Sequence, residues 1–171
     1  MGVPLRELIY EYGGGIKDGR NLKAVITGGS SVPVLTSDKV DVRMDFESLE
    51  EAGTMLGSAG VIVMDETVCM VKAALNMTRF YQHESCGQCT PCRQGTYWML
   101  RILDRIEHGN GKMEDLDLLL DICSNIDGNT ICPLGDAATP SVRSTLQNFR
   151  EEYEYHIAHK ECLTKVGSRF E

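Results

Sequence analysis

HESCGQCTPCRQG at residues 83–95 and TICPLGD at residues 130–136 govern the structure of the larger part of this chain. They form a C-x2-C-x2-C-x39-C pattern that consists of Cys86, Cys89, Cys92 and Cys132. Three thiolates at every third residue can surround one side of a compact metal centre, and a remote fourth can close it. Four sulfur ligands suit a [4Fe–4S] cluster or a structural zinc ion.

The spacing of these cysteines favours iron over zinc. Zinc sites usually pair two C-x2-C segments, whereas this sequence has a single triple run. Bacterial ferredoxins have the same C-x2-C-x2-C run and a proline after their last cysteine, as Pro133 follows Cys132. An iron–sulfur cluster is therefore the leading interpretation, and a zinc-stapled structural or interaction module is the alternative.

Composition limits the classes of protein to consider. A chain of 171 residues holds one domain or two small ones. A net charge of −8 argues against a nucleic-acid partner. The sequence shows neither a bilayer-length apolar run nor a signal peptide. We therefore expect a soluble or peripheral protein with reduced thiols, in the bacterial cytoplasm or an organelle matrix.

Residues 1–66 are predicted to form a small α+β unit. A helix is expected from Pro4 to Gly13, and β-type runs occur in LKAVITGG at residues 22–29 and GVIVMD at residues 60–65. The glycine-rich stretches match neither the phosphate-loop nor the dinucleotide-binding pattern, so we interpret them as turns.

Residues 67–160 are predicted to be helical, and residues 161–171 to form a C-terminal tail. Helix signals indicate four helices, over about 67–82, from Thr90–Pro91 to near Gly109, over about 114–126, and from Thr139–Pro140 to about 160. Thr67 is expected to cap the first helix. Short connections between the helices suggest a four-helix bundle. The fold class is thus α+β, a small sheet unit followed by a bundle.

Several other residues receive structural interpretations. Phe80 and Trp98 are assigned to apolar helix faces, and Cys69 and Cys123 to the core. The remaining cysteine, Cys162, is expected near the surface, and no metal is expected at any of these three thiols. Helix-end histidines and the acidic run are interpreted as solvated: His108, His156, His159, Glu151, Glu152 and Glu154. No constellation of catalytic side chains is recognisable, so no catalytic residue is predicted.

The predicted helices place the cysteines in loops and at a helix start. Cys92 falls in the first turn of the helix that starts at Pro91, whose N-terminal dipole favours the negative charge of a thiolate cluster. The backbone amides of Gly87, Gln88 and Thr90 are candidate hydrogen-bond donors to the cluster sulfurs. Cys132 precedes the fourth helix, so a cluster would join two loops of the bundle.

The two cysteine motifs, HESCGQCTPCRQG and TICPLGDAATP, resemble those of the NADH-binding flavoprotein subunit of respiratory complex I. NAD-linked hydrogenases and formate dehydrogenases have similar segments. The flanks agree with this resemblance, which extends over essentially the whole chain: GGSSVPVL, LGSAGVIVMD and FREEYEYHI. The resemblance implies that Cys86, Cys89, Cys92 and Cys132 ligate a [4Fe–4S] cluster that takes electrons from a reduced flavin.

The same resemblance carries expectations about fold and partners. Residues 1–66 are similar to the latter part of a β-grasp, ubiquitin-like domain. FMN and NADH are bound in a larger N-terminal domain of the family, whose glycine-rich loops do not occur in this sequence. We therefore expect a flavin- and NADH-binding partner segment or chain, other iron–sulfur subunits, and a peripheral position on the inner face of the bacterial membrane. This chain alone is expected to be inactive toward NADH.

Overall fold

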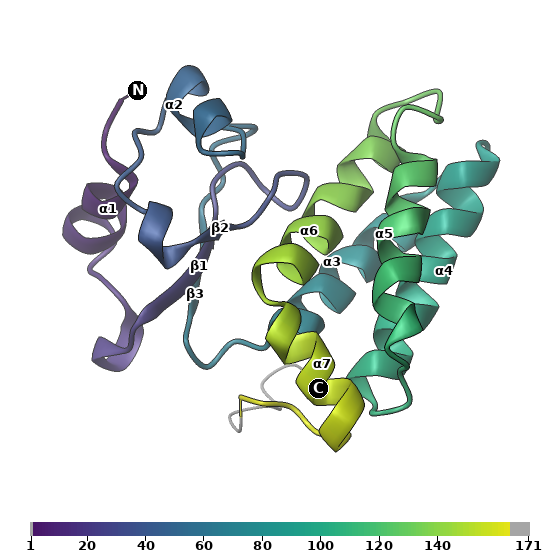
Figure 1. Ribbon diagram of the computed structural model, residues 1–171. Helices are drawn as coiled ribbons and strands as arrows, with labels where there is room; N and C mark the ends of the chain where they lie inside the picture. Colours follow the sequence, from purple (N-terminus) through teal and green to yellow (C-terminus); the bar gives the residue numbers. More distant parts are fainter. Residues whose placement is uncertain (1, 165–171) are drawn as a thin grey trace. The chain divides into compact units, whose positions relative to one another are not determined.

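The computed structural model describes residues 2–164, which form parts of two compact units divided between Val68 and Cys69 (Figure 1). The first unit contains a small antiparallel sheet with short helical turns, and the second is helical. No helix within residues 2–164 combines the length and the apolar character that a membrane crossing requires. The structure is thus α+β.

The sheet of the first unit has three strands in the order β2-β1-β3. The central strand β1 (Leu22–Ile26) pairs antiparallel with β2 (Leu35–Thr36) and with β3 (Ile62–Asp65). Both predicted β-type runs therefore contain strands, and the two-residue β2 was missed because it is too short for an alternating pattern. The β-grasp relationship remains a prediction.

Short helical segments cover part of the apolar surface of the first unit. They are α1 (Leu5–Glu7), the π-helical turn η1 (Leu8–Tyr12), the 3-10 turns η2 (Lys17–Gly19) and η3 (Ser37–Lys39), and α2 (Phe46–Glu51). The helical segment ends at Gly13 as predicted. The buried core consists of Leu5, Ile9, Val25, Leu35, Val40, Met44, Leu49 and Leu56.

The glycine-rich stretch after β1 allows two backbone segments, at Gly28 and at Gly57, to approach each other closely. A Cβ atom added at Gly28 would lie 2.6 Å from the carbonyl oxygen of Leu56, and one added at Gly57 would lie 2.4 Å from that of Gly28. Real side chains do not tolerate such distances, so both positions require glycine. This packing role agrees with the interpretation of the stretch as a turn.

The second unit contains five helices within the described residues: α3 (Met70–Glu84), α4 (Thr90–Glu107), α5 (Glu114–Ile126), α6 (Leu134–Asn148) and α7 (Arg150–His159). Helix α3 packs against α4 and α6, and α5 against α4 and α6 (Figure 1). Their shared core includes the fully buried side chains Met99, Leu103, Ile106, Leu116, Leu119 and Tyr153.

The predicted fourth helix is in fact two helices with an earlier start. Helix α6 begins at Leu134, so Pro140 lies inside it, and Phe149 separates α6 from α7. Proline removes one backbone donor, which would leave the carbonyl of Asp136 without its helical partner. The Thr139 hydroxyl lies 3.3 Å from that carbonyl, but its single hydrogen is donated to the closer carboxylate of Asp127. Helix α6 continues through Thr139–Pro140, so this pair is not a helix start.

Three further expectations for the helices were wrong. Cys69, not Thr67, caps α3, and its sulfur accepts from the amide of Lys72 at 3.4 Å. Phe80 is exposed and Tyr81 takes the buried position beside it, which is a shift of one residue in the apolar face. Trp98 is half exposed, because the stripe of buried residues on α4 runs through Gly95, Met99 and Ile102.

Candidate metal centre

The loop between α3 and α4 presents three of the four predicted ligand cysteines. Cys86 is exposed in the loop, Cys89 is the half-buried residue that precedes α4, and Cys92 is buried in the first turn of that helix. The helix thus begins one residue earlier than predicted, with Pro91 in its first turn. Each step of three residues moves the thiol from solvent toward the protein interior.

Local hydrogen bonds fix the shape of this loop. Gly87 has φ +79°, a conformation that favours glycine, and its carbonyl accepts from the Arg93 guanidinium at 2.6 Å. The hydroxyl of Ser85 lies 3.2 Å from the sulfur of Cys92 and accepts from the amide of Gly87 at 3.4 Å. The loop is therefore tied to α4 at both the arginine and the buried cysteine.

The fourth predicted ligand lies in the turn between α5 and α6. Cys132 is exposed, and the amide of the preceding Ile131 donates to the sulfur of Cys89 at 3.4 Å. The hydroxyl of Thr130 donates to the carbonyl of Cys132 at 2.9 Å. The hydrogen bond to Cys89 brings together two loops that are about forty residues apart in sequence.

The early start of α6 adds a second helix N-terminus to the two loops. Helix α4 begins directly after Cys89, and α6 begins two residues after Cys132. Free amides and the positive end of the helix dipole favour negative charge at such positions. Sequence reasoning identified this contribution for α4 alone.

A polar network holds the turn that carries Cys132. Asp127, at the end of α5, accepts from the hydroxyl of Thr139 and pairs with Arg143 at 2.7 Å. A Cβ atom added at Gly135 would lie 2.6 Å from the methyl carbon of Thr130. The first turn of α6 therefore packs directly on the Cys132 loop, and glycine is required there.

These residues have the chemistry of a centre with four thiolate ligands, although within residues 2–164 their sulfurs do not form a group in which all ligand atoms lie within 4.8 Å of one another. The donors are sulfurs from two loops joined by an amide–sulfur hydrogen bond, and two helix N-termini can offset their negative charge. Cys123, in contrast, is buried in the core, and burial raises the pKa of its thiol to about 12. It remains a thiol that packs as a hydrophobic residue.

The residues that sequence reasoning missed are those that hold the loops. Ser85, Ile131 and Asp127 carry no metal-ligand signature, and only their contacts reveal their roles. The predicted contribution of Gly87, Gln88 and Thr90 to the hydrogen bonding of a cluster remains a prediction. The structure shows one further amide donor, since the Ile131 amide donates to the Cys89 sulfur.

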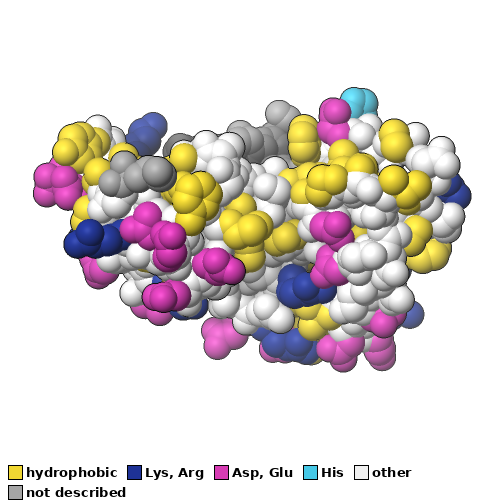
Figure 2. Space-filling model, turned by 90° about the horizontal axis from the view of Figure 1, so that it is seen from above, with side chains coloured by type: hydrophobic (Ala, Val, Ile, Leu, Met, Phe, Trp, Pro, Cys, Tyr) yellow, Lys and Arg dark blue, Asp and Glu magenta, His cyan; other side chains and the backbone are white. Residues whose placement is uncertain are grey.

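The surface around the ligand loops has exposed apolar groups. Ile131 is 85% exposed, beside the exposed Cys132. In the space-filling view from above, hydrophobic side chains, a class that includes cysteine, gather over part of the helical unit (Figure 2).

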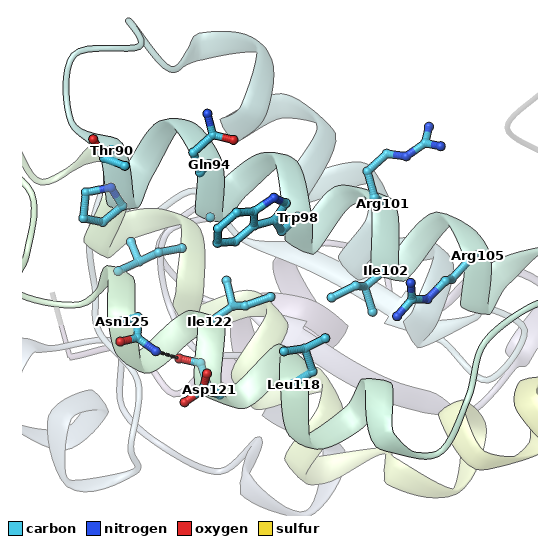
Figure 3. Close-up of a pocket in the computed structure, with 13 residues that line it drawn as sticks. Thr90, Gln94, Trp98, Arg101, Ile102, Arg105, Leu118, Asp121, Ile122 and Asn125 are labelled. Carbon is cyan, nitrogen blue, oxygen red and sulfur yellow. Dashed lines mark hydrogen bonds between the residues drawn. The ribbon is translucent and has the colours of Figure 1, made fainter.

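A groove of about 560 Å³ lies between α4 and α5 and begins at Thr90 and Pro91, next to the ligand loop. Trp98 lines it from α4, and Leu118 and Ile122 line it from α5 (Figure 3). Gly95 lets the helices approach closely here, since an added Cβ would lie 2.6 Å from the side chain of Ile126. Trp98 thus belongs to a surface groove and not to the core.

The fold and the cysteine loops define a class, a small helical module that carries four cysteines in two neighbouring loops. Residues 72–156 match the family described as the NADH-ubiquinone oxidoreductase-F iron-sulfur binding region. The chain contains this region, and its resemblance to the C-terminal portion of the complex I flavoprotein subunit is confirmed.

Curated relatives agree with this family. The chain is 51% identical over 162 residues to an F subunit of the NADH-quinone oxidoreductase of Rhizobium meliloti (strain 1021), with 95% of this chain and 38% of the relative covered. It is 48% identical over 162 residues to the F subunit of the same enzyme from Streptomyces coelicolor, with 95% and 36% covered. The chain thus spans little more than a third of the length of these relatives.

A solved structure supports the same fold. An NAD⁺-reducing [NiFe]-hydrogenase in the H₂-reduced state superimposes with a TM-score of 0.78 at 26% identity, covering 91% of this chain and 26% of the hydrogenase chain. The similarity to hydrogenase segments that the sequence indicated is therefore also found in the structure.

Proposed function

We propose that this chain is an electron-transfer module of an NADH:quinone oxidoreductase that holds a [4Fe–4S] cluster on Cys86, Cys89, Cys92 and Cys132. When bound, such a cluster exchanges single electrons between a reduced flavin and further iron–sulfur centres. The observation that carries the proposal is the bond from the Ile131 amide to the Cys89 sulfur, because it joins the two ligand loops. The family match at residues 72–156 supports it.

The residues of this chain would position and tune the centre. The N-termini of α4 and α6 offset the charge of the thiolates, and the Ile131 amide donates to one of them. Hydrogen bonds to cluster sulfurs raise the reduction potential by stabilising the more negative, reduced state. The amides of Gly87, Gln88 and Thr90 are proposed as further donors.

The exposed ligands and Ile131 indicate where a partner would bind. An electron carrier must approach the centre closely, and Cys86 and Cys132 are exposed at the surface. We propose that a flavin- and NADH-binding segment or chain, with its FMN, covers this end of the bundle. Other iron–sulfur subunits would receive the electrons, and the complex would hold the chain on the inner face of the bacterial membrane.

Two other functions remain as candidates. The hydrogenase neighbour at 26% identity favours an equivalent subunit of an NAD-linked hydrogenase, and the resemblance of the cysteine motifs extends to formate dehydrogenases. The four thiols could also hold zinc in a purely structural module.

The test is reduction of the anaerobically reconstituted chain by photoreduced FMN. We expect loss of the broad iron–sulfur absorption near about 400 nm, and the same loss with dithionite. Cys132→Ala should abolish this response and Cys123→Ala should retain it. A reconstituted chain that binds zinc and stays colourless would contradict the proposal. NADH with ferricyanide should not react with the chain alone, and NADH oxidation by the chain alone would contradict the assignment of the flavin site to a partner.

A further inference from the structure

A second group of potential metal ligands lies within the helical unit and away from the four cysteines already described. The ligand atoms of Cys69, His156 and Cys162 all lie within 4.8 Å of one another. Cys69 precedes α3, His156 belongs to α7, and Cys162 follows α7. His156 was expected on a solvated face and is 1% exposed, and Cys162 was expected at the surface and is half buried.

The imidazole of His156 is oriented as in metal-binding histidines. Its Nδ1 atom lies 2.7 Å from the carbonyl oxygen of Glu152. A carbonyl oxygen accepts and cannot donate, so Nδ1 carries the proton in this bond. The lone pair of a neutral imidazole is then on Nε2, which faces the Cys69 sulfur at 3.6 Å and a carboxylate oxygen of Glu107 at 3.5 Å. Metal-binding histidines usually donate their other nitrogen to a carbonyl in this way.

Glu107, the last residue of α4, supplies a fourth donor. One of its oxygens lies 3.9 Å from the Cys69 sulfur, in addition to its contact with His156. Its side chain is 17% exposed. Two sulfurs and a nitrogen thus form one mostly buried group, and the Glu107 carboxylate contacts two of its members, Cys69 and His156.

The separations among Cys69, His156 and Glu107 are close to those of tetrahedral coordination of one zinc ion, and the Cys162 sulfur lies within 4.8 Å of the Cys69 and His156 ligand atoms. With Zn–S of about 2.3 Å and Zn–N or Zn–O of about 2.0–2.2 Å, tetrahedral angles place sulfur and nitrogen about 3.6 Å apart, and nitrogen and oxygen about 3.4 Å apart. The corresponding distances are 3.6 Å and 3.5 Å. The sulfur–oxygen distance of 3.9 Å is longer than the ideal of about 3.6 Å. A small movement of the Glu107 side chain would remove this difference.

We propose that Cys69, His156, Cys162 and Glu107 bind one Zn²⁺ ion as a structural site. Mixed sulfur and nitrogen donors in a closed tetrahedral arrangement are typical of zinc. The ion would join the start of α3, the end of α4 and the segment after α7. Burial opposes protonation of His156, but hydrogen bonds to Cys69 and Glu107 raise the pKa of His156 to about 11. Binding therefore releases the Nε2 proton of His156 as well as the thiol protons of both cysteines to solvent, and the 2+ charge of the ion balances the two thiolates formed.

Chain geometry separates this site from the cysteine loops. Helices α3 and α4 connect the two regions, since α3 begins after Cys69 and ends before Cys86, and α4 begins after Cys89 and ends at Glu107. At 15 residues, α3 is about 22 Å long. The two groups of ligands therefore cannot share one metal.

The test uses the full chain with Cys86, Cys89, Cys92 and Cys132 all changed to alanine, so that these thiols cannot capture the added metal. We expect one zinc per chain after incubation with ZnCl₂ and desalting, and visible absorption typical of tetrahedral cobalt thiolate when Co²⁺ replaces Zn²⁺. His156→Gln or Cys162→Ala should weaken zinc binding by at least about 100-fold, because each removes a direct ligand. Cys123→Ala and His159→Gln are the matched controls and should bind as the parent does.

A second measurement covers the case in which the fourfold variant does not fold. The otherwise unaltered chain, reconstituted with iron and sulfide, should contain zinc in addition to iron, and Cys162→Ala should lose the zinc and keep the iron. Absence of zinc from the folded chain in the presence of excess ZnCl₂ would overturn the proposal. A Cys69–Cys162 disulfide under reducing conditions, detected as a mass lower by two hydrogens, would also overturn it.

Discussion

The helix pair α3–α4 has a group of cysteines at each end, and the two groups are brought together in different ways. At one end, Cys86, Cys89 and Cys92 occur within seven residues, with two helix N-termini nearby, and the outermost of them, Cys86, is exposed, as is Cys132. At the other end, Cys69 and Cys162 are separated by most of the helical unit and meet a buried histidine. Closely spaced ligands form a pattern that a sequence reveals, whereas ligands brought together by helix packing become apparent only in three dimensions.

The difference extends to the expected role of each end. Exposed ligands at helix N-termini suit a centre that exchanges electrons with a partner, since access and charge stabilisation are both provided. Buried ligands of mixed type suit a closed structural ion that exchanges nothing. Changes at the first end should therefore affect redox behaviour, and changes at the second should affect stability.

The largest effect is expected from removal of a ligand at the exposed end. Cys132→Ala should leave the reconstituted chain with less than one iron and lower the unfolding midpoint of the helical unit, because metal binding and folding are coupled. Iron analysis and circular dichroism measure the two effects. Cys123→Ala is the matched control, and equal iron loss in both variants would refute the ligand assignment.

A smaller effect is expected where α6 packs on the Cys132 loop. Gly135→Ala should destabilise the chain by about 1–3 kcal/mol, because the new methyl group overlaps the Thr130 side chain. Denaturant unfolding measures this loss. The double variant Gly135→Ala/Thr130→Ala should recover part of the stability, since it removes the atoms that clash most closely. If the double variant is no more stable than Gly135→Ala, the clash with the Thr130 side chain is not the cause of the destabilisation.

The polar network around Asp127 at the end of α5 should contribute less to the stability of the chain than the packing at Gly135 does. Thr139→Val removes the hydroxyl that donates to the carboxylate of Asp127, and we expect a loss of about 1 kcal/mol. The rate of iron release to a chelator should rise as the Cys132 turn loosens. Thr36→Val, which lies in β2 of the first unit, serves as the control. An unchanged release rate in Thr139→Val would show that the network does not hold the loop.

The smallest effect is expected on the exposed side of α3. Phe80→Ala should change stability by no more than about 0.5 kcal/mol, because the ring is 53% exposed. Tyr81→Ala should cost about 3–5 kcal/mol, because that ring is 5% exposed and packs in the core. Thermal unfolding of both variants compares the two neighbours directly. If Phe80→Ala and Tyr81→Ala lost similar stability, Phe80 would lie on the apolar face of α3, as the sequence predicted.

The sequence predicted features that depend on local signals. The boundaries of α5, the stop at Gly13 and the start of α4 within one residue follow from periodicity, glycine and proline. The strands β1 and β3 follow from short runs of β-branched residues.

Features decided by tertiary contacts could not be predicted. Thr139 donates its hydroxyl hydrogen to Asp127 at the end of α5, and α6 runs from Leu134 through Pro140, so a start signal lies inside the helix. Glu152 accepts from the amide of Met70 at 3.0 Å and is 6% exposed, although its acidic neighbours suggested a solvated face. The burial of His156 and Cys162 likewise depends on where α7 packs, for which a single sequence has no pattern.

Metal analysis of the unaltered chain tests the account most directly. Protein purified without oxygen, reconstituted with iron and sulfide and supplied with zinc should contain four iron, four acid-labile sulfide and one zinc per chain, on the basis of one four-thiolate cluster and one tetrahedral site. This result would assign iron to the exposed end and zinc to the buried end. A chain that contains zinc at both ends and no iron would contradict the claim that the exposed cysteines serve electron transfer.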